Sequence, residues 1–279
     1  MRLRLYHHSD GARVAYREAG TGQAVVLLHS LGLSHREWEP VVEPLAARFR
    51  VVMPDLPMHG DSEDRPRHPY TREWFTEVIG AFCGEVAGSR AALVGHGVGA
   101  ELALRAVLCG SCTPSKLVLM DNRLHHQTPY PLGRALWRAV AGLGVMPGTG
   151  KLLSHGAKFA FRPRLGERLS AQHNPQARDV VRHAFADVGG NGERARAWAK
   201  FVRRWPSAAQ RDLLDAYPTL TLPVLLLWAE ENQLAPLQWA AEARELIPRA
   251  QLRTIPGAGF LAAYDDPVVL ARELLSFCG

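Results

Sequence analysis

A glycine-rich segment, Gly95–Ala100, constrains the fold of this chain more than any other feature. It follows directly on the apolar run 91–94, and so predicts a buried strand that passes through a tight turn into a helix. Its spacing is that of a nucleophile elbow, Gly-x-Ser-x-Gly, in which the turn exposes a serine hydroxyl. Here the central residue is Gly97, which has no side chain and cannot attack a substrate. The chain has the turn for a nucleophile and lacks the nucleophile.

Short apolar runs alternate with helical patterns on both sides of this turn. An opening hairpin is expected from Leu3–His7 and Arg13–Arg17. Further strands are expected at Val25–Leu28, Val51–Pro54, Ala91–Val94, Lys116–Met120, Val224–Trp228 and Gln251–Ile255. Helices are expected at Arg36–Arg48, Arg72–Val86, from the turn to Leu108, Leu237–Leu246 and Pro267–Phe277. This alternation predicts an α/β fold, with a mostly parallel central sheet flanked by helices.

The alternation stops after Met120 and resumes at Val224. The segment between carries helical patterns broken by Pro and Gly. We expect residues 1–121 and 219–279 to form one α/β core, with residues 122–218 inserted as a helical cap. Such a cap would cover the C-terminal edge of the sheet, where open α/β folds bind their ligands. A chain of 279 residues has room for one core with one inserted subdomain.

The composition is that of a soluble globular protein, with 47% hydrophobic and 22% charged residues. No apolar run approaches the roughly 20 residues of a membrane span. The N-terminal residues lack the apolar core and cleavage site of a signal peptide. We therefore expect a cytoplasmic protein without membrane association.

The charge is distributed unevenly. Residues 122–218 contain sixteen Arg and Lys against six Asp and Glu, a local net charge of +10 in a chain of net charge +6. A basic insert favours an anionic substrate or an acidic partner such as an acyl carrier protein. The alternative is a set of solvated arginines on exposed helix faces. No nucleic-acid-binding motif accompanies the charge, so no nucleic-acid partner is expected.

Five motifs, in the correct order and spread over both ends of the chain, resemble those of the α/β-hydrolase fold superfamily. Besides the elbow they are the loop His29–Gly32, the segment Pro54–Ser62, the segment Leu226–Pro236 and the segment Ile255–Phe260. In the family, these four segments carry, in the same order, an oxyanion-hole amide, an Asp-x-x-Gly-x-Gly-x-Ser loop, the catalytic acid and the catalytic histidine. The resemblance implies the α/β-hydrolase fold and an oxyanion hole built from the backbone amides of Leu31 and Val98.

Carried over position by position, the resemblance implies that the whole catalytic triad is substituted. Gly97 stands at the nucleophile position, Asn232 at the acid position and Phe260 at the base position. Without a hydroxyl there is no acyl-enzyme, and without an imidazole there is no proton relay. Ordinary esterase, lipase or thioesterase activity is not expected from this atypical member.

The oxyanion amides can act without a nucleophile, because fixed donors also stabilise an enolate. Gly97 would leave space for a substrate, and Phe260 would form an apolar wall beside it. His96 and Asn232 complete the expected substrate-binding residues.

Two residues are candidates for proton transfer. Asp121 ends the sixth strand at the rim of the cleft, and His29 lies beside the oxyanion loop. Asp121 could pair with His125 or His126, which follow it closely; both histidines could instead be the solvated start of the cap.

These observations favour a cofactor-independent lyase, isomerase or cyclase that acts on a carbonyl-containing small molecule in specialised metabolite biosynthesis. The alternative is a catalytically inactive pseudo-hydrolase that binds a ligand or a partner. No His, Cys, Asp and Glu set has metal-site spacing, and no dinucleotide or phosphate-binding loop is present, so neither a metal nor a cofactor is expected.

Overall fold

The structure is a computed structural model that describes residues 1–65, 67–127, 169–190, 192–206 and 208–279. Its strands are β1 (Arg2–His7), β2 (Arg13–Ala19), β3 (Ala24–Leu28), β4 (Arg50–Pro54), β5 (Ala92–His96), β6 (Lys116–Met120), β7 (Val224–Ala229) and β8 (Ala250–Ile255). They form one sheet in the order β1-β2-β4-β3-β5-β6-β7-β8. β1 and β2 are antiparallel to each other, β2 is antiparallel to β4, and the remaining neighbours are parallel. The predicted α/β fold with a mostly parallel sheet is confirmed.

The helices of the described residues include the five with predicted bounds, which differ from the prediction only at their ends. The described helices are α1 (Glu39–Ala46), α2 (Arg72–Phe82), α3 (Val98–Leu108), α7 (Pro175–Gly190), α8 (Gly192–Arg204), α9 (Asp212–Ala216), α10 (Leu237–Leu246), α11 (Ala262–Asp265) and α12 (Pro267–Cys278). The helix predicted from Arg36 begins with a 3-10 turn, η1 (His35–Trp38), and α2 ends in a π-helical turn, η2 (Cys83–Ala87). A third short turn, η3 (Tyr217–Thr219), follows α9.

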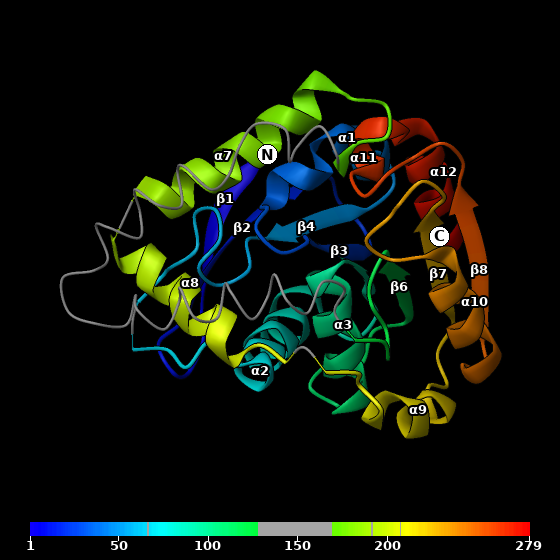
Figure 1. Cartoon of the computed structure of the whole chain (residues 1–279), viewed down its shortest axis with the longest axis horizontal. Coiled ribbons are helices and arrows are strands. Elements are labelled where there is room, and N and C mark those ends of the chain that lie inside the picture. The colour runs from blue at the N-terminus through cyan, green and yellow to red at the C-terminus, as the bar shows by residue number, and fades with distance from the viewer. Residues whose placement is uncertain (66, 128–168, 191, 207) are drawn as a thin grey trace.

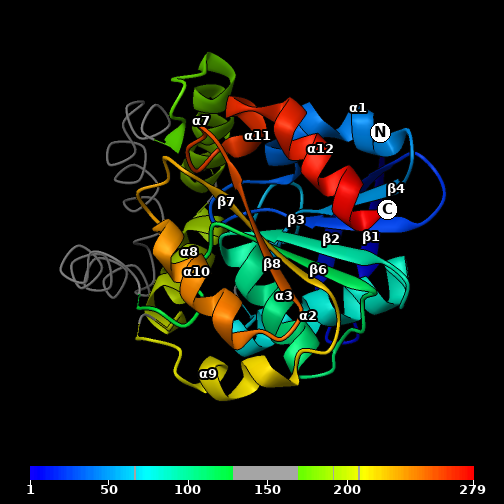
Figure 2. The same ribbon diagram turned by 90° about the vertical axis from the view of Figure 1, so that its right-hand side faces the viewer.

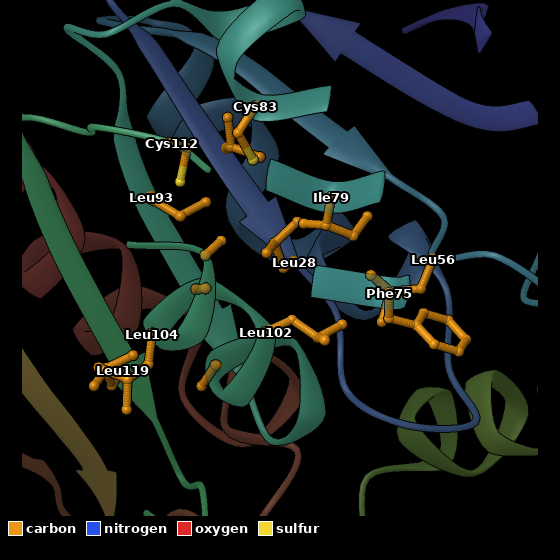
Figure 3. Close-up of a cluster of buried hydrophobic side chains, with 14 of the residues drawn as sticks. Leu28, Leu56, Phe75, Ile79, Cys83, Leu93, Leu102, Leu104, Cys112 and Leu119 are labelled. Atoms are coloured by element: carbon orange, nitrogen blue, oxygen red, sulfur yellow. The ribbon is translucent and has the colours of Figure 1, made fainter. Parts of the chain in front are cut away.

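The helices cover both faces of the sheet. α1, α11 and α12 lie over one face, and α2, α3 and α10 lie over the other (Figures 1 and 2). Successive side chains of β3 enter opposite cores: Val25 and Leu27 pack on the α1 and α12 side, and Val26 and Leu28 on the α2 and α3 side. Figure 3 shows the second core, where Leu28 faces apolar side chains of α2 and α3. Both faces of the sheet are therefore buried.

Helices α7 and α8 lie between β6 and β7 in the sequence. α7 packs on the α12 side through Ala177, Val180 and Val181. α8 packs on α2, where the ring of Phe201 meets that of Phe75 edge-on at 5.8 Å. Residues 128–168 of the expected cap lie outside the described residues, and the division into core and cap stays a prediction. In the described part of the chain, no helix combines the length and the apolar character needed to cross a membrane.

The position of α3 depends on two glycines of the turn. A Cβ atom on Gly99 would lie 2.4 Å from the carbonyl oxygen of Leu28 and 2.6 Å from that of His29. A Cβ atom on Gly95 would lie 2.5 Å from the Cα atom of Ala100. All of these neighbours are backbone atoms, which cannot turn away as a side chain can. Glycine at both positions lets the first turn of α3 lie directly against β3.

Gly99→Ala should therefore destabilise the protein by at least about 1–3 kcal/mol, because overpacking against backbone forces the helix away from the strand. Gly84→Ala is the matched control, since no atom from outside its own helical turn lies within 4 Å of the added Cβ, and it should leave the free energy of unfolding unchanged or slightly raised. Urea denaturation of both variants measures the difference. Equal stabilities would contradict the importance of this close approach.

Candidate active site

Gly97 lies between β5 and α3 with φ 54° and ψ −115°. Its amide donates to the carbonyl of Met120 at 3.0 Å, and its carbonyl accepts from the amide of Glu101 at 3.2 Å. A positive φ is readily adopted by glycine and strains other residues. The turn therefore has the sharp strand-to-helix form of an elbow although it carries no side chain.

The space above Gly97 is narrower than the sequence suggests. A Cβ atom at this position would lie 3.0 Å from the Cβ atom of Ser30 and 3.3 Å from Cζ of Phe260. The Phe260 ring also packs on the ring of His96, with centroids 4.2 Å apart. The Phe260 ring thus lies close against the turn, next to the point where the side chain of a nucleophile at residue 97 would start.

His96, the residue before Gly97, joins two buried carboxylates. Its Nδ1 contacts the carboxylate of Glu37, and its Nε2 lies 3.7 Å from Oδ2 of Asp121. Glu37 comes from η1, and its second oxygen accepts a hydrogen bond from the amide of Ser30 at 2.7 Å. Burial by itself lowers the pKa of His96, but the Glu37 carboxylate outweighs it, with Asp121 adding to the effect, so that the pKa is raised. The imidazole is thereby favoured in its charged form.

Asp121 follows directly on β6 and has a fully buried carboxylate. Its Oδ1 accepts from the amide of Ala229 at 3.1 Å, and its backbone has a positive φ of 46°. Burial raises the pKa of Asp121 to about 6, while His96, the Asn232 amide and the Ala229 amide oppose that rise. A carboxylate that titrates close to neutral pH is suited to accept and return a proton.

Four buried polar atoms around the turn make no hydrogen bond of normal geometry within the described residues, although Nε2 of His96 and Oδ2 of Asp121 lie 3.7 Å apart. They are Oγ of Ser30, Nε2 of His96, Oδ2 of Asp121 and Nδ2 of Asn232. The other side-chain atom of Asn232, Oδ1, accepts from the amide of Leu234 at 2.9 Å. Buried polar groups are nearly always paired, so a group of incompletely satisfied ones is a candidate place for a ligand or water to bind.

His29 does not take part in this group. Its Nδ1 donates to the carbonyl of Ser30 at 2.7 Å, and its Nε2 accepts from the amide of Leu56 at 2.8 Å. Burial lowers the pKa of His29. Because the backbone engages both ring nitrogens of a neutral imidazole, this side chain positions the oxyanion loop, and we assign it no proton transfer.

The amides of the expected oxyanion hole lie on either side of the turn. Val98 is the first residue of α3, and Leu31 is an exposed residue on the loop that follows β3. Neither amide donates to an acceptor within the described residues. Both donors are consequently available to an oxygen atom of a ligand.

The predicted pairing of Asp121 with His125 or His126 is wrong. His126 Nε2 lies 3.1 Å and His125 Nε2 lies 3.7 Å from Oε2 of Glu242 in α10. Asp121 turns instead toward His96, because its Oδ1 is tied to the Ala229 amide at the end of β7.

A cavity of about 170 Å³ opens beside the oxyanion loop. It extends from Gly32 to α7 and α8, and three arginines, Arg17, Arg36 and Arg194, line it. Arg17 is paired with Asp61 and Arg194 with Asp64. Arg36, on the exposed side, has no carboxylate partner among the residues that the structure describes, so it is the cation in this cavity best placed to meet an anionic group.

Glu37 is a residue of the candidate site that the sequence does not reveal. It lies 59 residues before His96, in a segment with no motif of its own. Only the packing of η1 against the elbow brings the two side chains together.

The comparisons with known proteins agree with this architecture. The sequence profile described as alpha/beta hydrolase fold matches residues 23–267. The magnesium-chelatase 30 kDa subunit of Rhodobacter capsulatus is 27% identical over 237 residues, which cover 85% of this chain and 80% of that protein. The pimeloyl-[acyl-carrier protein] methyl ester esterase of Vibrio vulnificus is 27% identical over 278 residues, covering 95% and 97%. An alpha/beta hydrolase fold protein from Burkholderia ambifaria superimposes with a TM-score of 0.79 at 21% identity, covering 98% and 97%.

The raised pKa of Asp121 gives a prediction about stability. The folded state holds this proton more tightly than the unfolded chain, so stability falls as pH rises from about 4 to about 6. Asp121→Asn keeps the oxygen that accepts from Ala229 and removes the titration. From pH 4 to pH 7 the variant should gain roughly 3 kcal/mol relative to the wild type, on the order of two pKa units. Urea unfolding at both pH values measures this gain, and a pH-independent difference would contradict a raised pKa.

Proposed function

We propose, since this chain belongs to the α/β-hydrolase fold family, that it catalyses a non-hydrolytic reaction at the carbonyl group of a small molecule. The reaction is an elimination, an isomerisation or a cyclisation, in a biosynthetic setting. The observation that carries the proposal is the group of four unpaired buried polar atoms around an elbow that has no nucleophile.

Several relatives and structural neighbours are named esterases or hydrolases, but the triad chemistry of the family has no support at this elbow. Gly97 offers no atom for a covalent intermediate, and Phe260 can neither accept nor donate a proton. The Phe260 ring lies 3.3 Å from the point where a Cβ atom of residue 97 would be. A restored serine side chain would thus meet an apolar ring instead of a base.

The remaining groups suit an enolate. The amides of Leu31 and Val98 would bind the carbonyl oxygen and stabilise the negative charge that develops on it. Oδ2 of Asp121 would take the proton from the neighbouring carbon. The same acid would return it to another carbon in an isomerisation, to the departing group in an elimination, or to the oxygen anion formed by ring closure in a cyclisation. His96, charged and held by Glu37, would stabilise the ionised form of Asp121. No electrons are gained or lost overall, so the reaction needs no redox partner.

A second candidate function is ligand binding without catalysis. It is favoured by the burial of Asp121 and Asn232, of which only 2% and 6% are exposed, and by the close packing of Phe260 on His96. In that case the four polar atoms would hold a ligand or water and exchange no proton with it.

We further propose that the substrate carries an anionic group or is bound to an acyl carrier protein. Arg36 at the edge of the cavity and the net charge of residues 122–218 support this, and the Vibrio vulnificus relative is named for a carrier-bound ester. Both forms of the substrate would enter beside the oxyanion loop.

Enolisation can be tested before the substrate is known. Incubation with a panel of ketones and β-keto esters in D2O should exchange the hydrogen next to the carbonyl, as followed by proton NMR. Val98→Pro removes one oxyanion amide at the first position of α3, where proline is tolerated, and should slow exchange about 100-fold or more. Asp121→Asn should slow it by a similar factor.

Val98→Ala is the matched control, because it changes the side chain and keeps the amide, and it should retain the exchange rate. Thermal unfolding checks that each variant is folded. Binding of panel compounds without any exchange would contradict catalysis and favour the ligand-binding function. Exchange at the wild-type rate in both Val98→Pro and Asp121→Asn would contradict the assigned roles.

Carrier docking has a separate signature. If exposed arginines attract an acyl carrier protein, the dissociation constant measured by calorimetry should rise steeply with ionic strength, because surface charges are screened by salt. An affinity that salt does not change would count against electrostatic docking.

A further inference from the structure

A second group of chemically active side chains lies away from the elbow. His125 and His126 are on the loop that follows β6, and Glu242 is in the middle of α10. One nitrogen of each histidine and one oxygen of the glutamate lie within 4.8 Å of one another. None of these three side chains contributes to the proposed reaction.

The spacing of these atoms is that of metal ligands. A zinc ion binds nitrogen and oxygen at about 2.0–2.2 Å in a tetrahedral arrangement, which places neighbouring ligand atoms roughly 3.4 Å apart. The two measured separations from Oε2 of Glu242, 3.1 Å to His126 Nε2 and 3.7 Å to His125 Nε2, lie on either side of that value.

His126 and Glu242 approach each other closely. Nε2 of His126 is buried and lies 3.1 Å from Oε2 of Glu242. A metal ion that binds both atoms would take the place of the proton that such a pair otherwise shares.

Aromatic side chains hold the two imidazoles in place. The ring of His126 stacks on Trp239 at 4.6 Å with an angle of 11° between planes, and the ring of His125 meets Tyr217 edge-on at 5.8 Å. The two imidazole centroids are 4.2 Å apart. A site whose ligands are already oriented loses less entropy when the ion binds.

The three side chains can be reached from solvent. Those of His125 and His126 are 12% and 23% exposed and that of Glu242 is 40% exposed, which gives an ion access to the site.

We propose that His125, His126 and Glu242 bind a zinc ion, with water at the fourth position. This ion would tie the loop that leaves β6 to α10, so it would fix the start of the expected cap to the sheet. The site is independent of the proposed function, since it shares no residue with the elbow.

Metal binding can be measured on protein without an affinity tag, stripped with a chelator and titrated with Zn²⁺ by calorimetry. We expect one tightly bound equivalent, and a Co²⁺-loaded sample should show the intense visible absorption of a four-coordinate ion. His126→Ala and Glu242→Gln should each weaken binding at least about tenfold, because each removes one of three protein ligands.

Two variants serve as matched controls. Glu245→Gln changes an exposed acid of the same helix, and His183→Ala removes an exposed histidine of α7, so both should bind zinc as the wild type does. Thermal unfolding without metal checks that all four variants are folded. Unchanged zinc affinity in His126→Ala and Glu242→Gln would overturn the proposal, and so would a wild-type protein that binds no zinc.

Discussion

The close approach of α3 to β3 at Gly99 is the constraint on which the rest of the site depends. Because the added Cβ would meet two backbone carbonyls at 2.4 and 2.6 Å, only glycine lets the helix begin directly at the end of β5. That position fixes the Val98 amide at the first residue of α3, directly after the turn. The elbow geometry is thus a property of the backbone, and it does not require a serine at residue 97.

Next to the turn, the carboxylates of Glu37 and Asp121 both lie beside the imidazole of His96. Burying ionisable groups is unfavourable unless they are paired, and apolar residues of similar size would often stabilise a core better. The pairing of His96 with Glu37 is close, whereas Asp121 keeps one oxygen without a hydrogen bond. An incompletely satisfied buried group of this kind is more readily explained by a role in binding or catalysis than by stability.

The order of strands and helices can be read from the sequence, because each strand of a parallel sheet is a short continuous apolar run between helical patterns. The ends of the helices are harder to predict, because neither the 3-10 turn at His35–Trp38 nor the π turn at Cys83–Ala87 produces a clear sequence pattern.

Among the site residues, those of the elbow and of the segments that contain Asn232 and Phe260 can be found from sequence motifs. Glu37 and Glu242 have none, since their partners are distant in the chain. Proximity in sequence also suggested the wrong partner for Asp121, whose direction is set by a hydrogen bond to β7.

The central claim is that the amides of Leu31 and Val98 still form a working oxyanion site beside Asp121. A crystal structure with a bound phenolate, a stable mimic of an enolate, tests it most directly. We predict that the phenolate oxygen lies about 2.7–3.1 Å from both amide nitrogens, with the ring carbon next to the oxygen-bearing one facing Oδ2 of Asp121. A phenolate that binds elsewhere, or an undisturbed Phe260 ring that closes off the turn in the complex, would contradict the claim.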